Sequence, residues 1–134
     1  MRNLKLTFMS VLMTVLISIP AMAQKTEKVI AVVNKADWCS VCVKNEDRAK
    51  TAFMEANKDG KVLFVVNNLT DDKTKAECAA DLEKTGINKD ALAKLKSTGM
   101  VYFFDGETKG LISSVSLKKK DADLVSAMKK ALDQ

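Results

Sequence analysis

Residues 36–42 decide the fold of this chain, and they read Ala36-Asp37-Trp38-Cys39-Ser40-Val41-Cys42. They follow an uninterrupted apolar run at residues 29–33, which is typical of a buried strand. They precede a segment whose apolar residues recur at helical spacing. We therefore predict a strand that ends in a Cys-x-x-Cys turn at the start of a helix.

This position favours dithiol chemistry. A helix start leaves backbone N–H groups unpaired and carries a partial positive charge, and both stabilise a thiolate on Cys39. The two-residue spacing keeps Cys42 close enough to attack a mixed disulfide formed on Cys39. A structural bond is the alternative, but so short a loop contributes little stability through chain entropy. The third cysteine, Cys78, is either a small buried apolar residue or a third redox thiol.

Residues 1–23 predict a secretory signal peptide. Arg2 and Lys5 form a basic start, residues 12–19 are apolar, Pro20 ends this run, and residues 21–23 match an A-x-A cleavage site. We expect cleavage before Gln24, a periplasmic or secreted protein, and no stable membrane anchor afterwards. An uncleaved anchor is the alternative, although the run is short for a membrane span. Residues 24–134 then form a single domain.

Composition limits the remaining function classes. The chain has 22 Lys and Arg against 17 Asp and Glu, and two of the basic residues lie in residues 1–23, so the rest carries a net charge of +3. Because the signs are interleaved, this favours a solvated surface, and we expect no nucleic-acid partner. The chain has no histidine, which excludes imidazole metal sites and a Cys–His nucleophile pair. We predict no metal and no cofactor beyond a reversible Cys39–Cys42 disulfide.

The rest of the sequence predicts alternating strands and helices. Gly60 and Gly86 mark helix ends. The expected caps of helix starts are Thr70 or Asp71, Asn88, and Asp121. The strand–helix–strand start predicts a parallel pair, and Asp105-Gly106 predicts an antiparallel hairpin. We expect strands at 28–33, 61–66, 100–104 and 111–117, and helices at 40–57, 71–84, 89–96 and 121–132.

This order of elements, together with the Trp38–Cys42 motif, resembles the thioredoxin-like superfamily over the whole of residues 24–134. The closest local match is the periplasmic C-terminal thioredoxin-like domain of DsbD-type disulfide reductases. The matching pieces are residues 36–39 with Cys42, and Phe103-Phe104-Asp105-Gly106 after a strand. The resemblance implies an α/β fold of three layers, in which a mixed central sheet carries helices on both faces.

The resemblance also implies roles for individual residues. Cys39 corresponds to the attacking, solvent-reachable thiolate, and Cys42 to the buried resolving thiol. Trp38 corresponds to an aromatic residue that packs beside the dithiol and shapes a docking surface, with an ordinary core tryptophan as the alternative. Ser40 and Val41 occupy the positions that tune the reduction potential, but they match neither thioredoxins nor strong oxidants.

Three departures from the family pattern stand out. Residues 24–134 contain no proline, so Gly99, or else Thr98, takes the place of the family's cis-proline facing the dithiol. We expect a trans bond there and a looser substrate groove. The family's buried acid falls on Val33, and its partner lysine falls near Val66. The helix at 89–96 is an insertion, which either adds to a partner-binding surface or pads the fold.

Two function classes follow. The first is an exported thiol–disulfide oxidoreductase that exchanges disulfides with protein thiols through Cys39 and Cys42, with a membrane-embedded redox partner. That partner supplies electrons if the protein reduces disulfides, and an oxidant is needed if the protein forms them. The second is a non-catalytic module of the same fold that binds a soft metal such as Cu(I), or a protein partner.

Overall fold

The computed structural model describes residues 27–134. The predicted signal peptide therefore lies outside the described residues. None of the helices in this part of the chain combines the length and apolarity that crossing a bilayer demands.

A four-stranded mixed sheet forms the middle layer, in the order β2-β1-β3-β4. β1 (Val29–Lys35) pairs in parallel with β2 (Val62–Asn68) and antiparallel with β3 (Met100–Asp105). β3 also pairs antiparallel with β4 (Leu111–Ser116). The predicted parallel pair and hairpin are thus confirmed. β1 has hydrogen-bonded neighbours on both sides and helices over both faces, which explains its continuous apolar sequence.

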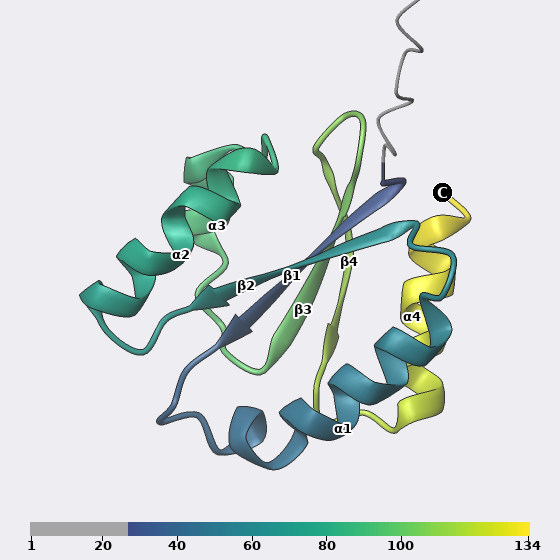
Figure 1. The fold of residues 1–134 in the computed structure, drawn as a ribbon, viewed down its shortest axis with the longest axis horizontal. Helices are drawn as coiled ribbons and strands as arrows, with labels where there is room; N and C mark the ends of the chain where they lie inside the picture. Colours follow the sequence, from purple (N-terminus) through teal and green to yellow (C-terminus); the bar gives the residue numbers. More distant parts are fainter. Residues whose placement is uncertain (1–26) are drawn as a thin grey trace, which may run out of the picture.

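Helices cover both faces of the sheet, which confirms the predicted three layers (Figure 1). On one face lie α1 (Ser40–Ala56) and α4 (Asp121–Leu132). On the other lie α2 (Asp72–Lys84) and α3 (Lys89–Lys94). Side chains alternate along each strand, so Ala31 packs toward α1 and α4 while Val32 packs with the apolar residues of α2 and α3.

Several element ends differ from the sequence prediction. β1 and β2 each run two residues further than expected, because Asn34 pairs with Asn67 and Lys35 with Asn68 in the sheet register. The sequence prediction ends both strands where these polar side chains begin. Inside the sheet their bonding is satisfied, since Asn67 Nδ2 donates to Asn34 Oδ1 at 3.0 Å. α3 is shorter than predicted and ends at Lys94.

The helix caps are mostly as predicted. Asp71 caps α2 and accepts a hydrogen bond from the backbone N–H of Thr74, and Asn88 caps α3. The prediction for Asp121 is wrong. Lys120 occupies the cap position of α4 without a side-chain bond, and Asp121 is the first helical residue. Its carboxylate is bound by Arg48 instead.

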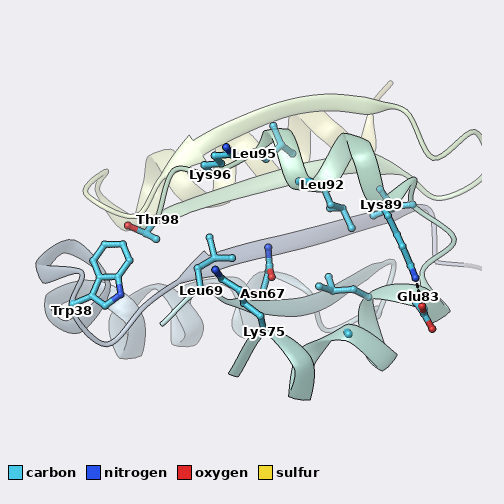
Figure 2. A pocket seen from close by; sticks show the side chains of 14 residues that line it. Trp38, Asn67, Leu69, Lys75, Glu83, Lys89, Leu92, Leu95, Lys96 and Thr98 are labelled. Atoms are coloured by element: carbon cyan, nitrogen blue, oxygen red, sulfur yellow. Dashed lines mark ion pairs between the residues drawn. The ribbon is translucent and has the colours of Figure 1, made fainter. Parts of the chain in front are cut away.

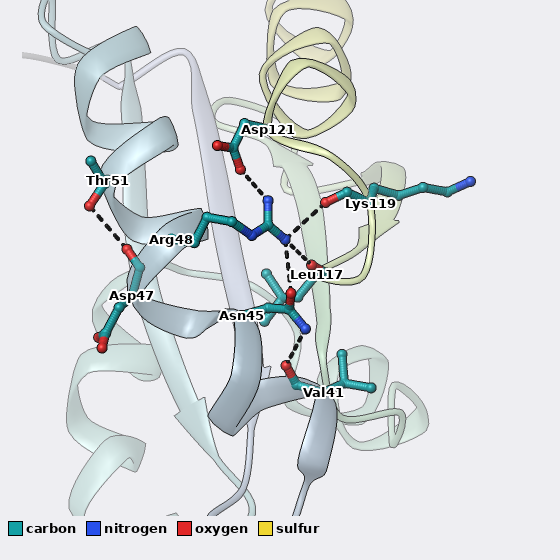
Figure 3. A network of polar contacts seen from close by, with 8 residues as sticks. All are labelled: Val41, Asn45, Asp47, Arg48, Thr51, Leu117, Lys119 and Asp121. Atoms are coloured by element: carbon teal, nitrogen blue, oxygen red, sulfur yellow. Dashed lines mark hydrogen bonds and ion pairs between the residues drawn. The ribbon is translucent and has the colours of Figure 1, made fainter.

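Arg48 joins α1 to the segment between β4 and α4 (Figure 3). Besides its ion pair with Asp121, the guanidinium donates to the carbonyl oxygens of Leu117 at 2.9 Å and Lys119 at 3.0 Å. It also donates to Asn45 Oδ1 at 3.0 Å. One side chain therefore satisfies two loop carbonyls and fixes where α4 begins.

We predict that Arg48→Met lowers the free energy of unfolding by about 0.5–1.5 kcal/mol, because the partly exposed bonds of the guanidinium to the loop carbonyls are lost. The matched control is Lys44→Met, on an exposed position of the same helix. Equilibrium unfolding in urea measures both variants. Equal stability of the two would contradict the structural role of Arg48.

Candidate active site

The two cysteines lie at the start of α1, as the sequence predicted. Cys39 is the N-cap residue, with an extended backbone, and Cys42 lies in the first helical turn. The backbone N–H of Cys42 donates to Cys39 Sγ at 3.3 Å, so a sulfur takes the place of the usual capping oxygen. Both are unbonded thiols here. Cys39 keeps 7% of its surface exposed and Cys42 only 1%, so an approaching partner reaches Cys39 first.

The surroundings push the acidities of the two thiols in opposite directions. Burial acts to raise the pKa of Cys39, but hydrogen bonds from the Cys42 and Thr98 side chains and from the backbone of the first helical turn together lower it. Burial raises the pKa of Cys42, and its interaction with the Cys39 sulfur raises it further. The thiolate therefore forms preferentially on Cys39.

Gly99 lies directly against the dithiol. A Cβ atom at this position would stand 2.9 Å from Val41 Cγ1 and 3.6 Å from Cys39 Sγ. The residue takes a left-handed backbone with φ of +73°, and the bond before it is trans, as expected, since residues 27–134 contain no cis peptide. Its N–H donates to the Asn34 carbonyl at 2.8 Å. A proline would not fit this backbone, because its φ is negative and it has no N–H.

Trp38 lies at the surface rather than in the core. Its side chain is 65% exposed, and Nε1 donates to the Thr70 carbonyl at 3.2 Å, which attaches the ring to the loop between β2 and α2. The alternative of a core tryptophan is therefore wrong. Of the two residues between the cysteines, which are predicted to tune the reduction potential and to contribute to docking, Ser40 is exposed and Val41 is half-buried against Gly99.

The positions of the family's buried acid and lysine carry no charge in this protein. Val33 packs against the core beneath α1, and Val66 is 45% exposed. A different charged pair lies close by. Lys35 Nζ contacts Glu46 Oε1 at 2.7 Å, and this bond, with smaller contributions from Asp37 and the Cys42 sulfur, raises the pKa of Lys35.

This ion pair is not among the features predicted from the sequence, although the spacing of its residues gives a signal for it. Lys35 lies two residues after Val33 and hence on the same face of β1, while Glu46 lies one helical turn after Cys42. The pair therefore places charge near the resolving thiol from positions that the family pattern does not use.

A groove of about 690 Å³ begins at Trp38 and Thr98 and continues between α2 and α3 (Figure 2). The ion pair between Glu83 and Lys89 lies at its far end. Its walls also carry Asn67, Lys75 and Lys96. The apolar walls include Leu69, Leu82, Ile87, Leu92 and Leu95. The helix predicted as an insertion thus forms one wall of a groove that opens beside the dithiol.

Other chemistry has little support in this part of the chain. Residues 27–134 hold no group of three or more His, Cys, Asp and Glu side chains that could bind a metal ion. Cys78 lies on α2 as a half-buried, unbonded thiol.

Comparisons with known proteins show similarity of fold. No protein-family model and no curated protein matches the chain. Solved structures do match it. One is a "putative protein disulfide isomerase" from Bacteroides thetaiotaomicron, with 20% identity and a TM-score of 0.52, covering 82% of this chain and 77% of that one.

Two thioredoxins are similar as well. The thioredoxin Mala s 13 of Malassezia sympodialis shares 15% identity with a TM-score of 0.50, covering 81% of this chain and 80% of that one. The germline-specific thioredoxin Deadhead of Drosophila melanogaster shares 16% identity with a TM-score of 0.50, covering 79% and 83%. The fold is therefore thioredoxin-like, as predicted. The finer likeness to the DsbD-type domain stays a prediction.

We predict that Cys39 in the reduced protein reacts with iodoacetamide several times faster than Cys42 at pH 7. The opposite pKa directions and the difference in exposure both favour Cys39. Peptide mass spectrometry after a short pulse of reagent measures each site. Equal labelling of the two sites would contradict the assigned roles.

We further predict that Gly99→Ala lowers the free energy of unfolding by about 1–3 kcal/mol, because the new side chain meets Val41 in a left-handed backbone. Gly110→Ala is the matched control. At Gly110 a Cβ meets nothing nearer than 3.5 Å, and no positive φ applies. Thermal unfolding measures both, and the idea fails when the control loses as much stability as Gly99→Ala.

Proposed function

We propose that this protein is an exported thiol–disulfide oxidoreductase that acts on protein disulfides. One observation carries the proposal: two thiols lie at a helix start with opposite pKa directions, and Cys39 keeps 7% of its surface exposed against 1% for Cys42. A thioredoxin-like fold supports it, and one similar structure is named for disulfide isomerase activity.

The reaction follows from the arrangement of the two sulfurs. The Cys39 thiolate attacks one sulfur of a partner's disulfide, and the other partner sulfur leaves as a thiolate. Cys42 then gives its proton to water and attacks Cys39 Sγ. The Cys39–Cys42 bond forms and the mixed disulfide breaks, releasing the second partner thiolate. The partner gains two electrons and this protein loses two.

Renewed turnover requires an electron donor outside the protein. We propose a membrane-embedded reductase, because the pattern of residues 1–23 indicates export to a compartment where disulfides persist. The DsbD-type resemblance supports the same direction of electron flow, toward reduction of the partner.

The groove beside the dithiol supports binding of an extended partner segment. Trp38 exposes a large aromatic surface at its mouth, and the walls between α2 and α3 are mainly apolar. Lys75 and Lys96 add positive charge. This favours partner segments that combine apolar with acidic residues.

A second candidate is a non-catalytic module that holds Cu(I) between the two sulfurs. It is favoured by the uncharged Val33 beside the core, since the family's proton-transferring acid is missing there. Thiolates are suitable ligands for this soft ion.

Reduction of insulin by the protein, residues 24–134, with dithiothreitol as electron source distinguishes the two candidates. We expect measurable activity, its loss in Cys39→Ser, and a trapped mixed disulfide in Cys42→Ser, because the resolving thiol is then missing. Cys78→Ser is the control and is expected to retain activity.

An inactive parent protein that binds Cu(I) tightly through Cys39 and Cys42 would replace the oxidoreductase proposal with the metal-binding one. Activity that survives Cys39→Ser would contradict both.

A further inference from the structure

A buried amide lies close behind the dithiol and has no part in the chemistry described above. Asn34 is 1% exposed, in the central strand of the sheet. Its Nδ2 donates to the Leu95 carbonyl at 2.6 Å, and its Oδ1 accepts from Asn67 Nδ2 at 3.0 Å. A polar side chain in such a place is costly unless its partners are fixed.

The same residue also binds the other end of the loop that follows α3. The backbone carbonyl of Asn34 accepts the N–H of Gly99 at 2.8 Å. Residues 95 and 99 are therefore both held by Asn34, one through its side chain and the other through its backbone. Thr98 and Gly99 complete this loop, and Gly99 lies against Cys39.

A second contact holds Gly99 from the opposite side. The N–H of Leu117 donates to the Gly99 carbonyl at 2.8 Å, and the Leu117 carbonyl accepts from Arg48. Both ends of the Gly99 backbone are thus fixed by hydrogen bonds. At the α3 end of the loop, by contrast, the Asn34 side chain makes the long-range polar contact to Leu95.

We propose that the Asn34 carboxamide is a positioning residue for the dithiol: by holding the Leu95 carbonyl it keeps the loop of residues 95–99, and with it Thr98, against Cys39. The proposal rests on the proposed function for its relevance to catalysis. Its direct consequence concerns the pH at which the Cys39 thiol loses its proton, and this can be measured whether or not the protein turns over a substrate.

The consequence is measurable because Gly99 of this loop lies against Cys39 and its neighbour Thr98 is one of the groups that lower the pKa of that thiol. A loop that loses its attachment to Asn34 moves Thr98 away from Cys39, and the pKa of the thiol rises. One hydrogen bond to a charged group corresponds to a shift of about one pH unit in the titration of that group.

The experiment measures the rate of Cys39 alkylation against pH in the reduced protein, with the labelled peptide quantified by mass spectrometry. The variants are Asn34→Leu, Thr98→Val and the double variant. The neighbouring ionisable groups Cys42, Lys35, Glu46 and Asp37 stay unchanged in all of them.

Asn67→Leu is the matched control. It removes the other half of the buried amide pair but leaves the bond between Asn34 and Leu95 in place. A purely structural role of the amide pair predicts the same result for both positions, whereas positioning of the loop predicts a shift for Asn34→Leu alone.

We expect the midpoint of the pH dependence of Cys39 alkylation to rise by about one pH unit in Asn34→Leu and in Thr98→Val. The double variant is expected to show no further rise, because both substitutions remove the same interaction. Asn67→Leu is expected to lower stability and to leave the midpoint in place. Additive shifts, an unchanged midpoint in Asn34→Leu, or an equal shift in Asn67→Leu would overturn the proposal.

If Asn34→Leu does not fold, Asn34→Ser replaces it, since its short hydroxyl side chain gives up the Leu95 carbonyl with less steric change. The same outcomes then apply. A shifted midpoint in a protein that fails to reduce insulin supports the positioning role and rejects the oxidoreductase, so the two proposals fail separately.

Discussion

The hydrogen bond from the Cys42 N–H to Cys39 Sγ is the contact on which the site depends. It uses an unpaired donor of the first helical turn to cap α1, so the same bond starts the helix and favours the thiolate. For this to work, β1 has to end just before residue 39 and α1 has to begin immediately after it. The parallel pairing of β1 with β2 and the packing of α1 on the sheet fix both positions.

At the end of β1, consecutive side chains point to opposite faces of the sheet and make different contacts there. Val33 and Lys35 point toward α1, where Lys35 meets Glu46. Asn34 points to the opposite face and binds the end of α3. Because side chains alternate along the strand, Val33 packs in the core, Asn34 binds the loop that faces the dithiol, and Lys35 lies near the resolving thiol. The site is supported from both layers of helices.

Much of this arrangement was predictable from local patterns. Apolar runs identified the strands, helical spacing identified α1 and α4, and glycine and Asx residues marked most helix ends. The Cys39–Cys42 pair and the place of Gly99 also followed, since they depend on short-range order and on the hairpin at residues 105 and 106. These features need no knowledge of distant contacts.

The missed features all depend on contacts between distant residues. Asn67 suggested a loop, because its partner Asn34 lies 33 residues away. Asp121 suggested a cap, because the competing Arg48 lies 73 residues away. Trp38 left two alternatives open, and its attachment to Thr70 across 32 residues decides between them. Propensity describes a residue's own preference, and in these cases a tertiary partner overrides it.

The backbone at Gly99 has a consequence for the history of such sites. A proline and a left-handed glycine require opposite signs of φ, and the proline also gives up the N–H that Asn34 binds here. Proline therefore cannot replace Gly99 in this backbone without strain, whereas glycine tolerates either sign of φ. A proline at this position needs the loop to take a negative φ and to give up the bond between the Gly99 N–H and the Asn34 carbonyl first, so the exchange is harder in one direction than in the other.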